Sequence, residues 1–169
     1  MFLRNLMHLI IVSFLYTIPL KVSVADQELV EQIDYILVEK EKRTLSVFHH
    51  KKLLKVYKIA LGSNPVGHKQ QEGDGRTPEG IYKISLKNPK SSFYLSLKIS
   101  YPNEQDQKSA QMRGVSPGGD IFIHGLRFGV IGALHRHWDW TQGCIALTNE
   151  EIQEVFAATE VGTIVEIRS

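Results

Sequence analysis

The chain has 169 residues, of which 43% are hydrophobic and 22% are charged. These fractions are typical of a soluble globular protein, and the length suits one domain with a real core. With 20 basic and 18 acidic residues the formal net charge is +2, and no basic block stands out. The composition therefore gives no electrostatic case for a nucleic-acid partner.

The N-terminal segment has the pattern of a secretory signal peptide. An apolar run over residues 6–20 follows a basic residue, and the small residues Ser23 and Ala25 occupy the −3 and −1 positions of a cleavage site. The alternative is a membrane anchor, but a spanning helix needs about 20 apolar residues and this run is shorter. We expect a signal peptide over residues 1–25 and one exported, monomeric domain over residues 26–169. It would act in the periplasm or cell envelope, with no membrane contact after cleavage.

The first part of the mature chain predicts three short strands. Residues 26–32 are expected to form a lead-in helix or tail. Alternating apolar and polar residues then predict strands over 33–38, 44–49 and 53–61, which are separated by charged turns. Short strands joined by tight turns favour an antiparallel meander.

Long polar segments separate the strands that follow. Residues 62–80 are rich in Gly, Pro and polar residues, and strands resume over 81–84 and 93–99. Residues 101–119 are again polar and Gly-rich, and a short apolar strand over 121–123 comes after them. Loops of more than about 12–15 residues in a compact domain are usually functional or disordered. The functional interpretation is favoured, because these loops flank the residues that can carry chemistry.

The last part of the chain predicts a loop, a helix and a closing strand. The loop covers residues 126–143. Thr148 or Asn149 can cap the helix, and Glu151 stands in the capping-box position three residues after Thr148. The closing strand covers 163–167. We therefore expect a mostly β domain, either a β-sandwich or a curled mixed sheet, with one clear helix after the cysteine.

Cys144 is the one cysteine of the chain, so no internal disulfide can form. A lone thiol in an exported protein is a buried small hydrophobe, an intermolecular link or a reactive group. A reactive thiol needs a base, and the candidates are His124, His135 and His137. His124 is favoured because it stands at the exit of an apolar strand. A backbone carbonyl after His124, or the Asp139 carboxylate, can orient the imidazole.

Gly143 leaves room for a substrate carbonyl immediately before the cysteine. The backbone groups of Gly143 and Gly125 are candidates for the oxyanion side of the site, together with the N–H of Cys144. Without further context, a Gly-Cys pair before a helix is more often structural than catalytic. A metal pair formed by His135 and His137 lacks the Cys, Asp or Glu partners of a zinc site, so we expect no metal and no cofactor.

These motifs resemble the YkuD-type L,D-transpeptidase family. The resemblance rests on His124-Gly125, on Thr141-Gln142-Gly143-Cys144-Ile145, and on Gly75-Arg76-Thr77-Pro78-Glu79-Gly80-Ile81-Tyr82 upstream. It implies a β-rich catalytic domain in which Cys144 is the nucleophile and His124 is the general base. The partner would be a peptidoglycan stem tetrapeptide: the thiol forms a thioester with it, D-alanine leaves, and an amine takes the acyl group.

Two positions depart from the family pattern. Gln142 stands where a His is usual, and Ala146 stands where an Arg is common. The missing Arg removes an anchor for substrate charge, for which Arg127 or Arg136 can compensate. The departures leave the reaction class in place and leave the donor and acceptor open.

The remaining residues expected along the substrate cleft are Trp138, Trp140 and Thr141. The acyl acceptor has two alternatives, because water in place of an amine would make the protein an L,D-carboxypeptidase or an amidase. A third alternative is a non-catalytic wall-binding module, in which Cys144 would be buried and unreactive.

Overall fold

The computed structural model describes residues 31–127 and 132–169 of the chain. The predicted signal peptide, and nearly all of the predicted lead-in segment 26–32, lie outside the described residues. Within those two ranges, no helix is long and apolar enough to cross a membrane.

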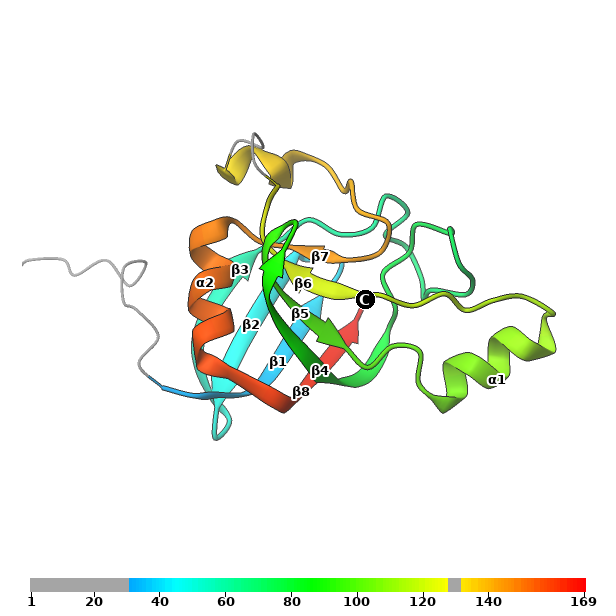
Figure 1. Ribbon diagram of the computed structural model, residues 1–169, viewed down its shortest axis with the longest axis horizontal. Helices are drawn as coiled ribbons and strands as arrows, with labels where there is room; N and C mark the ends of the chain where they lie inside the picture. The colour runs from blue at the N-terminus through cyan, green and yellow to red at the C-terminus, as the bar shows by residue number, and fades with distance from the viewer. Residues whose placement is uncertain (1–30, 128–131) are drawn as a thin grey trace, which may run out of the picture.

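Eight strands form one mixed sheet in the order β3-β2-β1-β8-β4-β5-β6-β7 (Figure 1). The first three strands pair antiparallel, so the predicted meander is confirmed. β8 pairs parallel with β1 and antiparallel with β4, and it thereby joins the meander to the second half of the sheet. The strands are β1 (Ile33–Glu39), β2 (Thr44–His49), β3 (Lys52–Lys58), β4 (Gly80–Ser91), β5 (Tyr94–Ile99), β6 (Phe122–His124), β7 (Ile145–Ala146) and β8 (Thr159–Arg168).

The sheet curls until residues that follow β3 reach β7. The backbone groups of Ala60 and Ala146 exchange hydrogen bonds of 3.1 and 2.9 Å, and Gly62 bridges to Thr141. Alternation along the strands turns apolar side chains into the enclosed core, where each contributes roughly 1.5–3 kcal/mol relative to an exposed position. Of the two predicted architectures, the curled mixed sheet is the one that forms.

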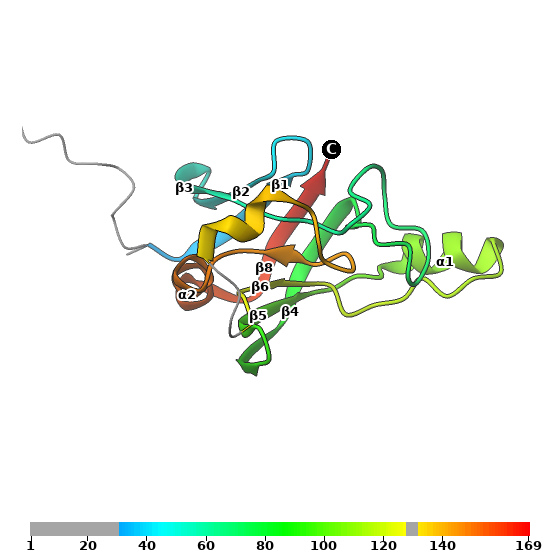
Figure 2. The same cartoon turned by 90° about the horizontal axis from the view of Figure 1, so that it is seen from above.

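The predicted helix after the cysteine is α2 (Asn149–Ala158). Its N-cap is Thr148, whose hydroxyl accepts from the N–H of Glu151 at 3.3 Å, while the Glu151 carboxylate accepts from the N–H of Thr148 at 3.0 Å. Ile152 and Val155 are fully buried. Figure 2 shows the helix end-on beside the curled sheet. The capping box and the buried apolar stripe therefore explain both its start and its position.

A second helix, α1 (Glu104–Met112), lies in the polar segment 101–119, where no helix was expected. It projects away from the sheet in both views (Figures 1 and 2). It buries only Asp106 and Ala110, so it has no apolar stripe that the sequence could reveal. The Asp106 carboxylate accepts from Tyr82 Oη at 3.1 Å and pairs with His68 Nε2 at 3.1 Å. These buried polar contacts hold the helix against the body.

β4 is longer than the strand predicted over 81–84. Its second half forms a hairpin with β5 that closes at Ser91 opposite Tyr94. The residues of this half are mostly partly or fully exposed, so they lack the apolar alternation that marks a half-buried strand. The hairpin tip extends one wall of the candidate site.

Candidate active site

Strands β6 and β7 bring the predicted nucleophile and base to the same surface. They run parallel, with Ile123 opposite Ile145 and His124 opposite Ala146. Ile123 and Ile145 are fully buried in the core. Because side chains alternate along a strand, His124 and Cys144 lie on the other face as diagonal neighbours.

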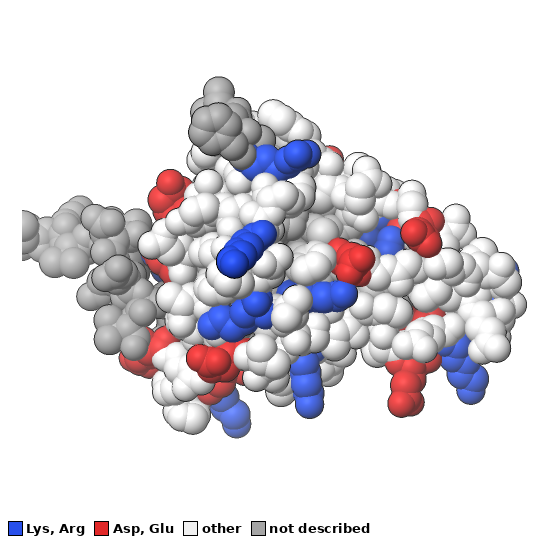
Figure 3. Space-filling model, in the orientation of Figure 1, with Lys and Arg blue, Asp and Glu red and all other residues white. Residues whose placement is uncertain are grey.

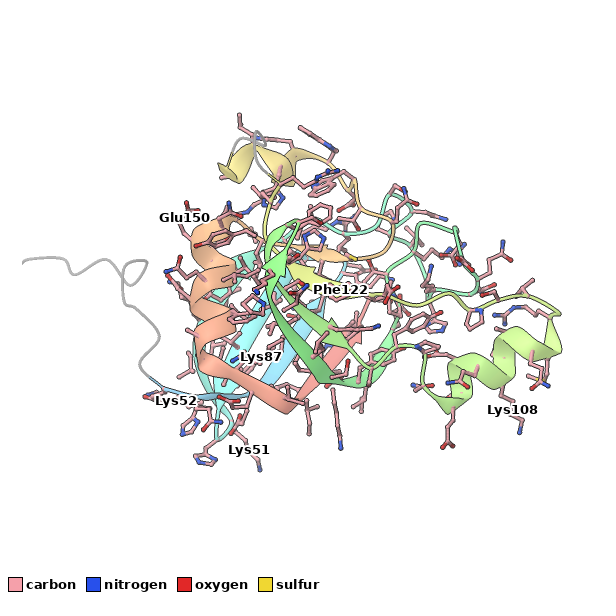
Figure 4. All side chains as sticks on the ribbon, in the orientation of Figure 1. Lys51, Lys52, Lys87, Lys108, Phe122 and Glu150 are labelled. Carbon is pink, nitrogen blue, oxygen red and sulfur yellow. The ribbon has the colours of Figure 1, made fainter. Side chains whose placement is uncertain are left out.

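Both side chains line one cavity of about 440 Å³, a volume that suits part of a peptide. Its walls come from the β4–β5 hairpin, from Asp120 and β6, and from the loop that precedes β7. Figure 4 shows Phe122, one of the lining residues, near the middle of the molecule on β6. The lining consists of Asn88, Ser91, Ser92, Phe93, Ser96, Asp120, Phe122, His124, Trp140, Thr141, Gln142 and Cys144.

The Cys144 thiol is partly buried. Its S–H donates to the carbonyl oxygen of Asp120, with 3.6 Å between sulfur and oxygen. Burial raises the pKa of the thiol, and the Asp120 carboxylate adds to this, while the N–H of Phe122 and the charge of Lys69 oppose it. The thiol is therefore protonated at neutral pH and needs a base to become a nucleophile.

His124 meets the requirements for that base. It is 4% exposed, and its Nδ1 lies 2.6 Å from the carbonyl oxygen of Gly125. A carbonyl can only accept, so Nδ1 carries the proton and Nε2 keeps a free lone pair. Burial lowers the pKa of the imidazole, against the influence of the Gly125 carbonyl, so the ring is neutral at pH 7. A neutral ring with a free lone pair is what proton abstraction from a thiol requires.

The group that orients His124 is therefore the backbone carbonyl, one of the two predicted alternatives. The other, Asp139, is engaged elsewhere. Its carboxylate accepts from the Arg43 guanidinium at 2.8 and 3.0 Å and from the N–H of Leu61 at 2.9 Å.

Gly125 orients the base and offers no N–H to an oxyanion. Its own N–H donates to the carbonyl of Leu95 at 3.1 Å, which corrects the predicted oxyanion role. A Cβ at this position would lie 2.6 Å from Oδ1 of Asn149, the atom that accepts from the N–H of Leu126 at 2.7 Å. The missing side chain thus lets the start of α2 pack against the strand that carries His124.

Thr141 shapes the turn that carries the nucleophile. Its hydroxyl donates to the carbonyl of Cys144 at 2.7 Å and accepts from the N–H of Gly143 at 3.1 Å. The N–H of Gly143 is therefore already bonded. The N–H of Cys144 has no acceptor within the part of the chain that the structure describes. It is the better candidate for an oxyanion donor.

Gly143 also sets the close contact between this turn and the loop over 62–80. Its φ of +122° disfavours any residue with a side chain, and a Cβ would lie 2.6 Å from the carbonyl oxygen of Arg76. A Cβ on Gly62 would lie 2.1 Å from the carbonyl oxygen of Gly75. Bare backbones thus pack together here, and the upstream Gly-Arg-Thr-Pro motif supports the catalytic turn.

Replacing Gly143 by alanine is expected to lower the free energy of unfolding by about 2–4 kcal/mol, because strain and a backbone clash add. The turn must shift to relieve the clash, and a shift of about 1 Å can lower kcat/KM about 100-fold. Urea denaturation and a transfer assay measure the two effects. Gly73→Ala is the control, since its φ is +77° and no atom lies within 4 Å of its Cβ. Equal losses in both variants would contradict the packing argument.

Aromatic rings form the wall around the base. The ring centroid of Phe93 lies 4.5 Å from that of His124 and 6.4 Å from that of Trp140. His135, in the 3₁₀ segment Gly132–His137, meets Trp140 edge-on at 6.5 Å. Burial lowers the pKa of His135 to about 4, so its ring is neutral and packs behind this wall. Trp140 lines the cavity as predicted, and Phe93 is an addition to the predicted set.

Two predicted cleft residues lie elsewhere, and a third is at the rim. Arg136 pairs with Glu151 of the α2 capping box, and Trp138 is 60% exposed; neither lines the cavity. The guanidinium of Arg127 stacks 5.7 Å above the ring of Phe93. Ala146 is fully buried in β7. The lining therefore holds no cation in place of the missing arginine.

The lining residues that the sequence interpretation missed come from the β4–β5 hairpin and from the start of β6. The hairpin supplies Asn88, Ser91, Ser92 and Ser96. These small polar residues carry no chemical signature, so no pattern marks them. Phe122 could have been predicted from the sequence, because alternation places it on the same strand face as His124. Asp120 immediately precedes the predicted strand over 121–123.

The described residues that could share a metal ion lie away from the cavity. Among residues 31–127 and 132–169, the group of side chains close enough to share an ion is Asp34, His49 and His50, whose ligand atoms lie within 4.8 Å of one another. These residues belong to the start of β1 and the β2–β3 turn.

Cys144 and His124 thus line one cavity on a curled, mostly β sheet. Residues 33–167 match the family of L,D-transpeptidase catalytic domains, YkuD. The chain belongs to this family, as its motifs suggested.

Known relatives agree with this assignment. YafK of Escherichia coli (strain K12) carries the name L,D-transpeptidase. It is 32% identical to this chain over 136 residues, which cover 77% of this chain and 48% of that protein. The chain thus spans about half the length of the curated relatives it matches.

Solved structures show the same fold. Bd1075 of Bdellovibrio bacteriovorus superposes with a TM-score of 0.59 at 28% identity, over 82% of this chain and 48% of that one. The K307A mutant of the helical cell shape determining protein Pgp2 of Campylobacter jejuni superposes with a TM-score of 0.60 at 25% identity. The match covers 83% of this chain and 48% of that one.

Proposed function

We propose that the protein is an exported peptidoglycan L,D-transpeptidase that uses Cys144 as nucleophile and His124 as general base. One observation carries the proposal: the Cys144 thiol and the His124 imidazole line the same cavity, and the Gly125 carbonyl lies 2.6 Å from Nδ1 of His124, which leaves Nε2 to accept a proton. The family assignment supports the substrate class, a stem tetrapeptide of the cell wall.

The proposed first half-reaction forms a thioester. Nε2 of His124 takes the thiol proton while sulfur bonds to the carbonyl carbon that precedes the terminal D-alanine. The oxyanion then accepts a hydrogen bond from the N–H of Cys144. When the tetrahedral intermediate collapses, the C–N bond breaks and the imidazolium returns its proton to the departing D-alanine amine. The acyl group stays on Cys144.

The proposed second half-reaction transfers the acyl group to an amine. The amine loses a proton to Nε2 and attacks the thioester carbon, the C–S bond breaks, and the sulfur regains the proton. The aromatic wall of Phe93 and Trp140 limits the access of water to the thioester, which favours transfer over hydrolysis.

The test is incubation of the protein lacking residues 1–25 with tetrapeptide-stem muropeptides, followed by mass spectrometry. The expected products are free D-alanine, an acyl-enzyme adduct on Cys144 and cross-linked dimers. Shortened stems without dimers would make water the acceptor and the protein an L,D-carboxypeptidase. The absence of any adduct or product would refute the proposal.

A further inference from the structure

Within the described residues the cavity lining contains one carboxylate, which belongs to a residue whose main chain contacts Cys144. Among the lining residues that the structure describes, Asp120 is the one Asp, Glu, Lys or Arg. Its carbonyl oxygen accepts the S–H of Cys144, so the residue that bears the carboxylate touches the thiol. The charge disfavours formation of the thiolate. A carboxylate in this position hinders formation of the thiolate, so its presence is best explained if it binds part of the substrate.

The backbone conformation of Asp120 is also unusual. Its φ is +55°, in the left-handed region that non-glycine residues rarely adopt. This turn comes immediately before β6 and leaves the side chain 78% exposed at the mouth of the cavity. The carboxylate is therefore open to solvent and to a ligand, while its main chain is fixed against the thiol.

The present partner of this carboxylate is a primary ammonium group. Nζ of Lys98 lies 2.7 Å from Oδ1 of Asp120 and 5.7 Å from the ring centroid of Phe122. Lys98 does not line the cavity. Figure 3 shows several basic groups across the middle of the face that it draws, with an acidic group beside them. An exposed ion pair of this kind is weak, so another ammonium group can replace the lysine at little cost.

We propose that Asp120 forms an ammonium subsite at the mouth of the cleft, where a primary amine of the substrate takes the place of Lys98 Nζ. The subsite deepens the proposed function, because the second half-reaction consumes an amine that arrives protonated. The carboxylate attracts the amine and raises its local concentration. The ammonium then leaves the carboxylate and releases one proton to solvent, and when the resulting neutral amine attacks, its second proton passes through Nε2 of His124 to the departing sulfur. Asp120 is therefore a binding residue, which acts on KM more than on kcat.

The first test is direct binding, which needs no catalysis. The Cys144→Ser protein is titrated with glycyl-D-alanine amide, whose one charge is its ammonium group, and with the neutral N-acetyl form, by NMR. We expect tighter binding of the cation. Asp120→Asn should weaken it about three- to tenfold, the effect of one exposed charge-assisted hydrogen bond. Asparagine tolerates the left-handed backbone, so the turn is kept. Glu160→Gln, an exposed carboxylate on β8, is the control.

A matched variant is expected to raise the affinity for the cationic peptide, where Asp120→Asn lowers it. Lys98→Met frees the carboxylate, so the cation should bind more tightly than to the parent protein. Equal affinities for the two peptides, no detectable binding, or an unchanged affinity in Asp120→Asn would each overturn the subsite. These results do not depend on turnover, so they are distinct from a failure of the transferase proposal.

Kinetics separate the two possible sources of the ammonium. If it belongs to the acceptor, Asp120→Asn should raise the KM for the amine and leave acyl-enzyme formation unchanged. If it belongs to the donor stem, the variant should slow acylation at low donor concentration, and acetylation of the donor amine should do the same. Unchanged rates in both half-reactions would contradict the subsite.

Discussion

Replacing Cys144 by alanine is expected to reduce acyl transfer by about 10⁴-fold or more, because the sulfur forms the bond to the substrate carbon. The N–H of residue 144 and the cavity stay in place, so substrate binding should persist and the residual rate should reflect binding alone. Intact-protein mass spectrometry measures the adduct, and product analysis measures the rate. We expect no adduct on the variant.

The single cysteine makes this prediction unusually clean. Iodoacetamide should label the parent protein once and the variant not at all, which reports on the thiol without any substrate. The midpoints of thermal unfolding of the two proteins should agree within a few degrees, since the substitution removes one partly buried sulfur atom. Full transfer activity in the alanine variant would rule out covalent catalysis. Unreactive native thiol would favour the wall-binding module.

The presence of His124 and Cys144 in one cavity was predictable because each residue adjoins a short, regular strand. His124 ends an apolar strand and Cys144 begins another ordered segment, so a pattern of alternation locates both. The capping box at Thr148 was equally predictable, since it depends on two residues three positions apart. The family resemblance supplied the substrate class, which no periodicity could have shown.

The rest of the site depends on contacts between distant segments. Asn88, Ser91 and Ser92 enter the cavity because a polar hairpin twists over it, and nothing in their own sequence indicates burial or function. The bare-backbone contact between Gly143 and the Arg76 carbonyl depends on two loops that meet only in the folded state. Arg136 was expected in the cleft as a replacement for the arginine that Ala146 displaces, but it pairs with the carboxylate of Glu151 in the capping box.

Replacing His124 by glutamine is expected to lower kcat/KM about 10²- to 10⁴-fold, the usual contribution of a general base. The parent protein should show a broad pH profile. Because burial lowers the pKa of His124, the base is lost only when the pH falls below the ordinary histidine value of about 6.5. At high pH the activity should fall, because the pair then lacks the proton that His124 passes to the departing amine. Because burial raises the pKa of Cys144, this fall should lie above the ordinary thiol value of about 8.5.

The variant should change the shape of this profile as well as its height. Without the imidazole, the acid limb should disappear, and the residual rate should rise with pH as thiolate forms. His137→Gln, an exposed histidine outside the cavity lining, should retain the parent profile. Alkylation of the parent thiol by iodoacetamide should also increase about tenfold per pH unit near neutrality, because the resting pair is neutral. Alkylation that is independent of pH above about 5 would instead indicate a preformed thiolate–imidazolium pair, and His124 would then act by stabilising the thiolate and not by removing its proton during attack.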